Sequence, residues 1–219
     1  MLLIVNILII MFSLTNFFSF SFWRWVNLLW SFALLCFTTF DLYWGVANAH
    51  EIFQVYLTRN WIIFFGGDGI SDCFSWLVAF ILPICYLALW NNTFKPLLLL
   101  NLISVIGIFL NCAFYCYDLL AFYFFFESTL IPMFLIIGVW GSRVEKVKAS
   151  YYFFLYTLSG SLLLIIGILY LHVTVGSTFI FYLTIDLHYQ YYLWLLFFIA
   201  FAVKIPIFPF HIWLPEAHV

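Results

Sequence analysis

Charged side chains are scarce in this sequence. Only 7% of the 219 residues are Asp, Glu, Lys or Arg, whereas 68% are hydrophobic. A soluble globular domain carries about 25% charged residues, so the composition excludes that class. The formal net charge is −2, whereas proteins that bind nucleic acid usually carry a basic surface. The charge therefore suggests no nucleic-acid partner. The sequence therefore indicates an integral membrane protein.

Motifs for metal binding, phosphate binding and secretion are missing as well. No histidine or acidic cluster accompanies Cys112 and Cys116, so no metal site is predicted. Gly66–Gly69 lacks the context of a phosphate-binding loop, and we interpret it as a turn in which Asp68 caps the next helix. A secretory signal begins with basic residues, and none precedes the first apolar run. Leu2–Phe22 is therefore predicted to be a retained membrane span.

Long apolar runs dominate the rest of the chain. A membrane-spanning helix needs about 20 mostly apolar residues, and Trp and Tyr gather at its interfacial ends. Two longer connections interrupt the runs, at Gly45–Gly69 and Val173–Gln190. The pattern predicts an all-α integral membrane protein with about seven transmembrane helices. The predicted spans are Leu2–Phe22, Trp25–Trp44, Ile70–Trp90, Leu97–Tyr117, Leu119–Trp140, Tyr151–His172 and Tyr191–Trp213.

The last of these spans contains a lysine at its centre. A charge there costs about 2.5–3.5 kcal/mol on insertion scales, and it normally faces a bundle interior or a water-filled cavity. Pro206 and Pro209 follow Lys204 closely, and each proline lacks a backbone N–H and clashes with the preceding helical turn. We therefore predict a discontinuous seventh helix. A charge beside such a break is typical of an ion or proton pathway.

Glu127 is the second charged residue near the centre of a span. Pro132 follows it within two turns and is expected to kink that helix. Because Glu127 and Lys204 carry opposite signs, we predict that they pair across two packed helices. Such a pair could form part of a proton pathway, or it could be a structural ion pair that only orients the helices.

Two histidines follow the predicted helix break. His211 lies two residues beyond Pro209, and His218 lies three residues after Pro215. Histidine titrates near neutral pH and can relay protons. Both residues are therefore candidates for a proton relay, although a histidine near a bilayer surface can also be simply amphipathic.

Three long segments of the sequence resemble one known family. They are FYFFFESTLIPMFLIIGVWG, ASYYFFLYTLSGSLLLIIG and FAVKIPIFPFHIWLPEAHV. These segments resemble NADH dehydrogenase (ubiquinone) subunit 4, an antiporter-like membrane subunit of respiratory complex I. The segment GDGISDCFSWLVAFILPICYLALW also fits this family. The resemblance runs from about Gly67 to Val219, and the preceding residues are only generically similar.

The resemblance implies a fold and a set of site residues. The family has two inverted repeats of five helices, so the chain is expected to form the N-terminal half of that fold. We accordingly expect a region 1–66 with the first two helices and an external loop, and a region 67–219 with helices three to seven. In the family, a glutamate and a lysine form the input pair of a proton half-channel, and these residues correspond to Glu127 and Lys204. His211 and His218 match histidines in the region that leads to the family's central hydrophilic axis.

The resemblance also implies a function and a location. The chain is expected to be a proton-translocating membrane-arm subunit of NADH:ubiquinone oxidoreductase in the mitochondrial inner membrane. NADH, flavin, iron–sulfur clusters and ubiquinone are then expected in other subunits, with no cofactor in this chain. Two alternatives stay open: a structural membrane-arm subunit without pumping, and a subunit of a cation/proton antiporter.

The family pattern continues beyond the last residue of this chain. The family has an eighth helix with a second lysine, followed by a second repeat. Half a channel would leave polar faces against lipid, which a bilayer disfavours. We therefore expect a separate chain to supply the remaining helices, with a truncated chain as the alternative.

Overall fold

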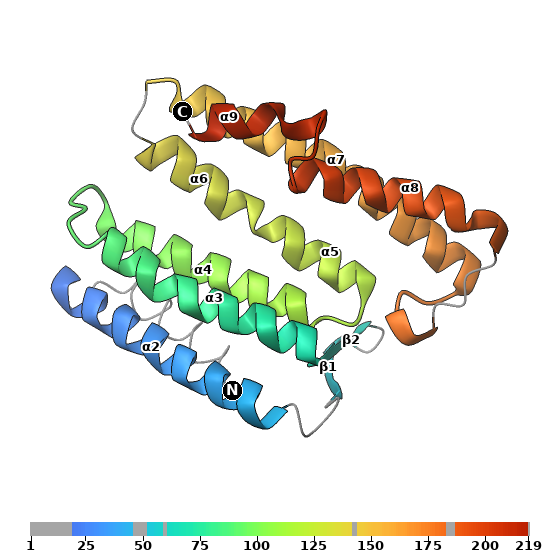
Figure 1. Cartoon of the computed structure of the whole chain (residues 1–219), viewed down its shortest axis with the longest axis horizontal. Coiled ribbons are helices and arrows are strands. Elements are labelled where there is room, and N and C mark those ends of the chain that lie inside the picture. The colour runs from blue at the N-terminus through green and yellow to red at the C-terminus, as the bar shows by residue number, and fades with distance from the viewer. Residues whose placement is uncertain (1–18, 46–51, 59–60, 142–143, 183–186, 219) are drawn as a thin grey trace. The chain divides into compact units, whose positions relative to one another are not determined.

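Among the residues that it describes, the computed structural model combines helices with one small sheet (Figure 1). The sheet pairs β1 (Ile52–Thr58) with β2 (Trp61–Gly66). It lies in the connection Gly45–Gly69, which was predicted to be an external loop. The predicted span Leu2–Phe22 falls outside the described residues except at its end. The structure describes residues 19–45, 52–58, 61–141, 144–182 and 187–218.

The long helices follow the predicted spans. Within the described residues, five helical stretches are long and apolar enough to cross a membrane. The structure therefore confirms the prediction of a helical, multi-pass membrane protein. The stretches are α2 (Phe20–Gly45), α3 (Gly69–Ala88), α4 (Pro96–Tyr115), α5 (Leu119–Ser128) continued by α6 (Leu130–Trp140), and α7 (Lys146–Val175).

The last predicted span is interrupted. The helix α8 (Leu187–Lys204) ends at the lysine, and a short 3₁₀ turn, η2 (Phe210–Ile212), leads into α9 (Trp213–His218). Pro206 and Pro209 both lie in the interruption, where a missing N–H and a bulky ring prevent the helix from continuing. The predicted discontinuity of this helix is confirmed.

The structure divides into two compact units, and the first contains α2, α3 and α4. The helix α3 packs against both α2 and α4. Its N-terminus is fixed by a capping box, because Asp68 Oδ1 accepts a hydrogen bond from Ser71 N at 2.8 Å and Ser71 Oγ accepts one from Asp68 N at 2.7 Å. The predicted cap at Asp68 is thus confirmed. Beyond the other end of α3, Arg24 of α2 donates to the carbonyl oxygen of Trp90 at 2.6 Å.

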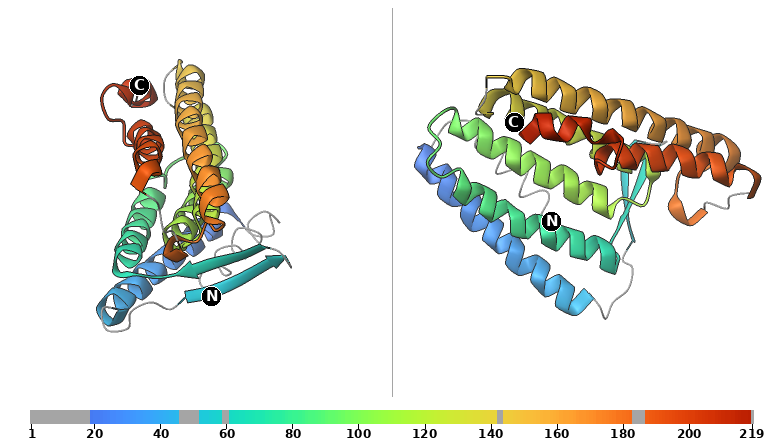
Figure 2. Two further views of the ribbon diagram at one scale, coloured as in Figure 1. Left: turned by 90° about the vertical axis from the view of Figure 1, so that its right-hand side faces the viewer. Right: turned by 45° about the horizontal axis from the view of Figure 1, so that its top comes forward.

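The second unit is organised around α7. This helix packs against α5, α6, α8 and α9, and Figure 2 shows α8 running beside it. Two glycines permit the close approach of α8. A Cβ atom on Gly160 would lie 2.9 Å from Val203 Cβ, and one on Gly167 would lie 2.7 Å from the Phe197 ring. Small residues at such crossings let membrane helices pack closely.

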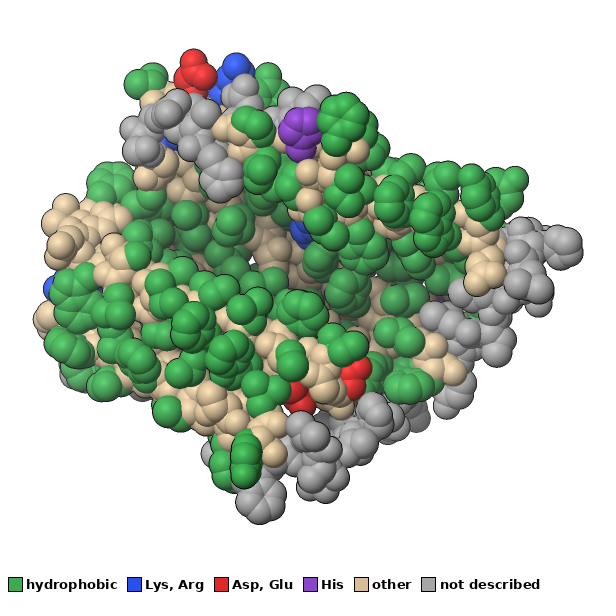
Figure 3. Space-filling view, viewed as in Figure 1, with side chains coloured by type: hydrophobic (Ala, Val, Ile, Leu, Met, Phe, Trp, Pro, Cys, Tyr) green, Lys and Arg blue, Asp and Glu red, His purple; other side chains and the backbone are tan. Residues whose placement is uncertain are grey.

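Large hydrophobic side chains remain exposed along the helices. The exposed fractions are 50% for Ile84 of α3, 53% for Ile166 of α7 and 46% for Phe198 of α8. Hydrophobic side chains cover most of the face shown in Figure 3. Exposed apolar surface of this extent indicates contact with lipid or with partner proteins.

Candidate functional site

Glu127 lies in the last turn of α5. The helix ends at Ser128, and α6 resumes at Leu130 before Pro132, which has no N–H for a helical hydrogen bond. The last carbonyl groups of a helix lack their usual partners and accept other donors. The hydroxyl of Thr129 donates to the carbonyl oxygen of Phe126 at 2.8 Å. The break therefore presents polar backbone beside the glutamate, near the middle of an apolar stretch.

Lys204 is the last residue of α8. The chain brings α5 and α8 to the same side of α7 through a shared hydrophobic core. The buried members of this core are Leu164, Ile168 and Ala200, and partly buried residues of α5 pack against them. A cation at a helix C-terminus also interacts favourably with the helix dipole. Packing around α7 thus positions the lysine opposite the end of α5.

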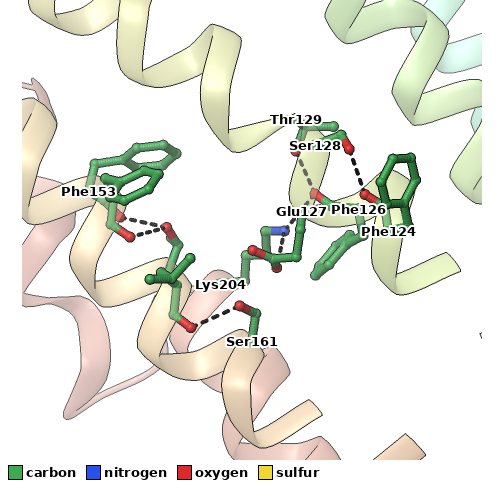
Figure 4. A network of polar contacts seen from close by, with 11 residues as sticks. Phe124, Phe126, Glu127, Ser128, Thr129, Phe153, Ser161 and Lys204 are labelled. Atoms are coloured by element: carbon green, nitrogen blue, oxygen red, sulfur yellow. Dashed lines mark hydrogen bonds and ion pairs between the residues drawn. The ribbon is translucent and has the colours of Figure 1, made fainter. Parts of the chain in front are cut away.

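The structure brings Glu127 and Lys204 together, as the sequence predicted. Lys204 Nζ lies 3.7 Å from Glu127 Oε1, and their side chains are only 20% and 14% exposed (Figure 4). This distance is too long for a hydrogen bond, so the two groups form an ion pair. The hydroxyl of Ser161 on α7 donates to the carbonyl oxygen of Leu158 at 2.9 Å. Within the described residues, both buried carboxylate oxygens lack a hydrogen-bond donor.

Sequence reasoning missed a third member of this site. Lys204 Nζ donates to the carbonyl oxygen of Phe126 at 3.2 Å and lies 2.9 Å from the centroid of its ring. No sequence signal separates this phenylalanine from its aromatic neighbours in FYFFFE. Only the packing of α8 against the end of α5 identifies it.

The predicted histidines contribute less to the described site. The ring of His211, in η2, lies 5.7 Å from the ring of Phe208, and its described contacts do not include the Glu127–Lys204 pair. Its Nδ1 atom is buried without a hydrogen-bond partner among the described residues. His218 lies in α9, but its side chain falls outside the described residues. Their predicted role as proton relays stays a prediction.

Trp213 connects the two parts of the interrupted helix, α8 and α9. Its indole Nε1 donates to the carbonyl oxygen of Val203 at 2.9 Å, a group near the end of α8 that lacks its helical partner. The Trp213 ring also packs against Phe153 of α7, with ring centroids 5.3 Å apart, and against Leu130 of α6. This one side chain therefore fixes the segment after the break to the residue preceding Lys204.

We expect Trp213→Phe to lower thermal stability. Phenylalanine keeps an aromatic ring but removes the donor, and an unsatisfied buried carbonyl costs about 1–3 kcal/mol. The measurement is the unfolding midpoint in detergent. Trp194→Phe on α8 is the matched control, because Trp194 is 56% exposed. Equal midpoints for the two variants would show that the bond to Val203 contributes nothing measurable.

Comparison with known protein families supports the resemblance seen in the sequence. Residues 116–219 match the family model described as NADH:quinone oxidoreductase/Mrp antiporter, transmembrane. The chain is 42% identical over 211 residues to NADH-ubiquinone oxidoreductase chain 4 of Chondrus crispus, covering 90% of this chain and 41% of that protein. It is 48% identical over 165 residues to the same chain of Prototheca wickerhamii, covering 70% and 30%. The chain thus spans less than half the length of these relatives.

A solved structure resembles the whole fold. A chain of respiratory complex I from Thermus thermophilus with bound NADH is 26% identical, with a TM-score of 0.84. The match covers 100% of this chain and 47% of that chain. The predicted resemblance is confirmed: the chain is similar in sequence to NADH-ubiquinone oxidoreductase chain 4 and similar in fold to a membrane chain of respiratory complex I.

Proposed function

We propose that this chain is a membrane-arm subunit of a NADH:ubiquinone oxidoreductase and forms part of a proton half-channel in the mitochondrial inner membrane. The observation that carries the proposal is the Glu127–Lys204 ion pair, 3.7 Å long and mostly buried beside two helix breaks. Ionisable groups inside a membrane protein mark ion and proton pathways by default. The similarity to relatives named NADH-ubiquinone oxidoreductase chain 4 supports the assignment to this complex.

The pair provides a way to couple charge movement to proton transfer. An opposite charge nearby favours the ionised form of each group, whereas removal from water disfavours it. While the carboxylate is close, the amine of Lys204 therefore keeps its proton. When a neighbouring charge draws the carboxylate away, that attraction weakens while the cost of removal from water remains. Lys204 can then release its proton. The driving charge would come from other subunits, where the electron-transfer cofactors are also expected.

Glu127→Gln tests this function while preserving the shape of the side chain. We expect the rate of proton transport per assembled complex to fall about tenfold, the change produced by 1.4 kcal/mol of lost pairing energy. The measurement uses inner-membrane vesicles with a pH-sensitive dye and NADH as the electron donor. Glu145→Gln is the matched control, because Glu145 is exposed before α7.

The outcomes separate pumping from a structural role. A pair that only orients helices predicts fewer assembled complexes, each with a normal transport rate. A normal rate together with normal assembly would reject any role for the carboxylate. A stand-alone antiporter subunit instead predicts ion flux from the purified chain in liposomes, without NADH.

The proposal also places this chain among other membrane-arm subunits. The resemblance to a complex I chain supports this placement. Whether a separate chain supplies the remaining helices of the family fold stays a prediction. Purification of the intact complex, followed by mass spectrometry of its membrane subunits, tests it directly.

A further inference from the structure

We infer that Phe126 is a positioning residue that holds the charged amine of Lys204 through its ring face and its carbonyl oxygen. The inference rests on the proposed function and deepens it. It adds a second, uncharged binding site for the amine beside the carboxylate of Glu127. Lys204 can therefore keep a partner when the carboxylate moves away.

The distances favour Phe126 over Glu127 as the group that orients the amine. Lys204 Nζ is 3.2 Å from the Phe126 carbonyl oxygen, within hydrogen-bond range, but 3.7 Å from Glu127 Oε1. An ammonium group has three donors and no acceptor, so one N–H can bind the carbonyl while the charge faces the ring. The ring centroid lies 2.9 Å from the nitrogen. The negative face of an aromatic ring attracts a cation, most strongly where water is excluded.

The ring is held in place by other aromatic residues. It stacks on Phe122, one turn earlier in α5, at 5.2 Å between centroids and an angle of 22°. The ring also lies edge-on to Phe201 of α8, at 6.1 Å between centroids and 67°. Phe201 precedes Lys204 by less than one helical turn. The two contacts therefore fix the ring relative to both helices and present its face to the amine.

The carbonyl oxygen is available because α5 stops here. Phe126 lies in the last turn of α5, which ends at Ser128, and carbonyls of a last turn lack helical partners. The oxygen accepts from the hydroxyl of Thr129 as well as from Lys204. The helix break thus creates an acceptor next to the ring, on the same residue.

Substitutions that keep or remove the ring face test the inference. Phe126→Leu and Phe126→Met keep an apolar side chain but have no ring, and methionine adapts well to an irregular space. We expect either change to slow proton transport per assembled complex roughly threefold to thirtyfold, the effect of losing a cation–π contact. Phe126→Tyr and Phe126→Trp keep the ring face and should restore transport. Phe124→Leu is the matched control, because Phe124 is on the same helix and 60% exposed.

The possible results lead to different conclusions. Normal transport in the Leu and Met variants, with loss of transport in Lys204→Met, would overturn the role of Phe126 and leave the proposed function standing. Loss in all four Phe126 variants would also overturn the inference, because shape rather than the ring face would then decide the rate. Normal transport in Lys204→Met would instead overturn the proposed function itself.

Discussion

Lys204→Met is expected to abolish proton transport by assembled complexes. Methionine fills a similar volume with an unbranched apolar chain, but it carries no proton and no charge. The hydrogen bond to Phe126 and the ion pair to Glu127 are both lost. Transport measured with a pH-sensitive dye in proteoliposomes should fall to the background rate, whereas the amount of complex on native gels should stay close to normal.

A control and a double variant sharpen this experiment. Lys148→Met removes an exposed lysine that lies over the ring of Tyr152, and transport should be unchanged.

Removing one partner of a buried pair costs about 3–5 kcal/mol when the other charge stays unpaired. Because Glu127 can take up a proton instead, the loss of stability in Lys204→Met should be smaller. The double variant Glu127→Gln/Lys204→Met should then be at least as stable as Lys204→Met. Normal proton transport in Lys204→Met would contradict the proposal.

Gly160→Leu is expected to disrupt the packing that positions Lys204. Even a Cβ atom at residue 160 would lie 2.9 Å from Val203 Cβ and 3.1 Å from its Cγ1. Val203 is 6% exposed, and its branched side chain has little rotamer freedom. Overpacking of this kind costs about 1–3 kcal/mol, enough to lower protein abundance severalfold. Quantitative immunoblotting of membranes measures this effect.

The neighbouring residue provides a control for Gly160. Ser159 is exposed on α7, so Ser159→Leu adds the same side chain without pushing against α8. Combining Gly160→Ala with Val203→Ala should recover part of the loss seen in Gly160→Ala, because the clashing methyl groups are removed. If Gly160→Leu and Ser159→Leu accumulate equally, the close approach of α7 and α8 contributes little to assembly.

The helices and the charged pair could be predicted because strong local rules govern them. Apolar runs located the helices to within a few residues at most ends, as for the predicted span Ile70–Trp90 and the observed helix Gly69–Ala88. Pro206 and Pro209 predicted the interruption after Lys204, since proline cannot continue a helix. Two opposite charges inside apolar spans predicted a contact, because isolated charges are costly in lipid.

Other features depend on residues that are distant in sequence. The sheet of β1 and β2 lies in a connection that was expected to be a loop, because strand pairing in such a segment depends on contacts that composition does not reveal. The bond from Trp213 to Val203 and the contact of Phe126 with Lys204 likewise join separate elements. Neither contact follows from helical periodicity.

The sequence by itself determined that this chain spans a membrane, where its last long helix breaks, and which two opposite charges lie inside the apolar spans. These properties follow from residue hydrophobicity, proline geometry and the cost of charge in lipid, which act locally. Only the tertiary structure decided how the lysine is held: by a carboxylate at 3.7 Å, a carbonyl oxygen at 3.2 Å and an aromatic ring. The physical reason is that α7, through its core and its glycine contacts, sets which faces of α5 and α8 meet.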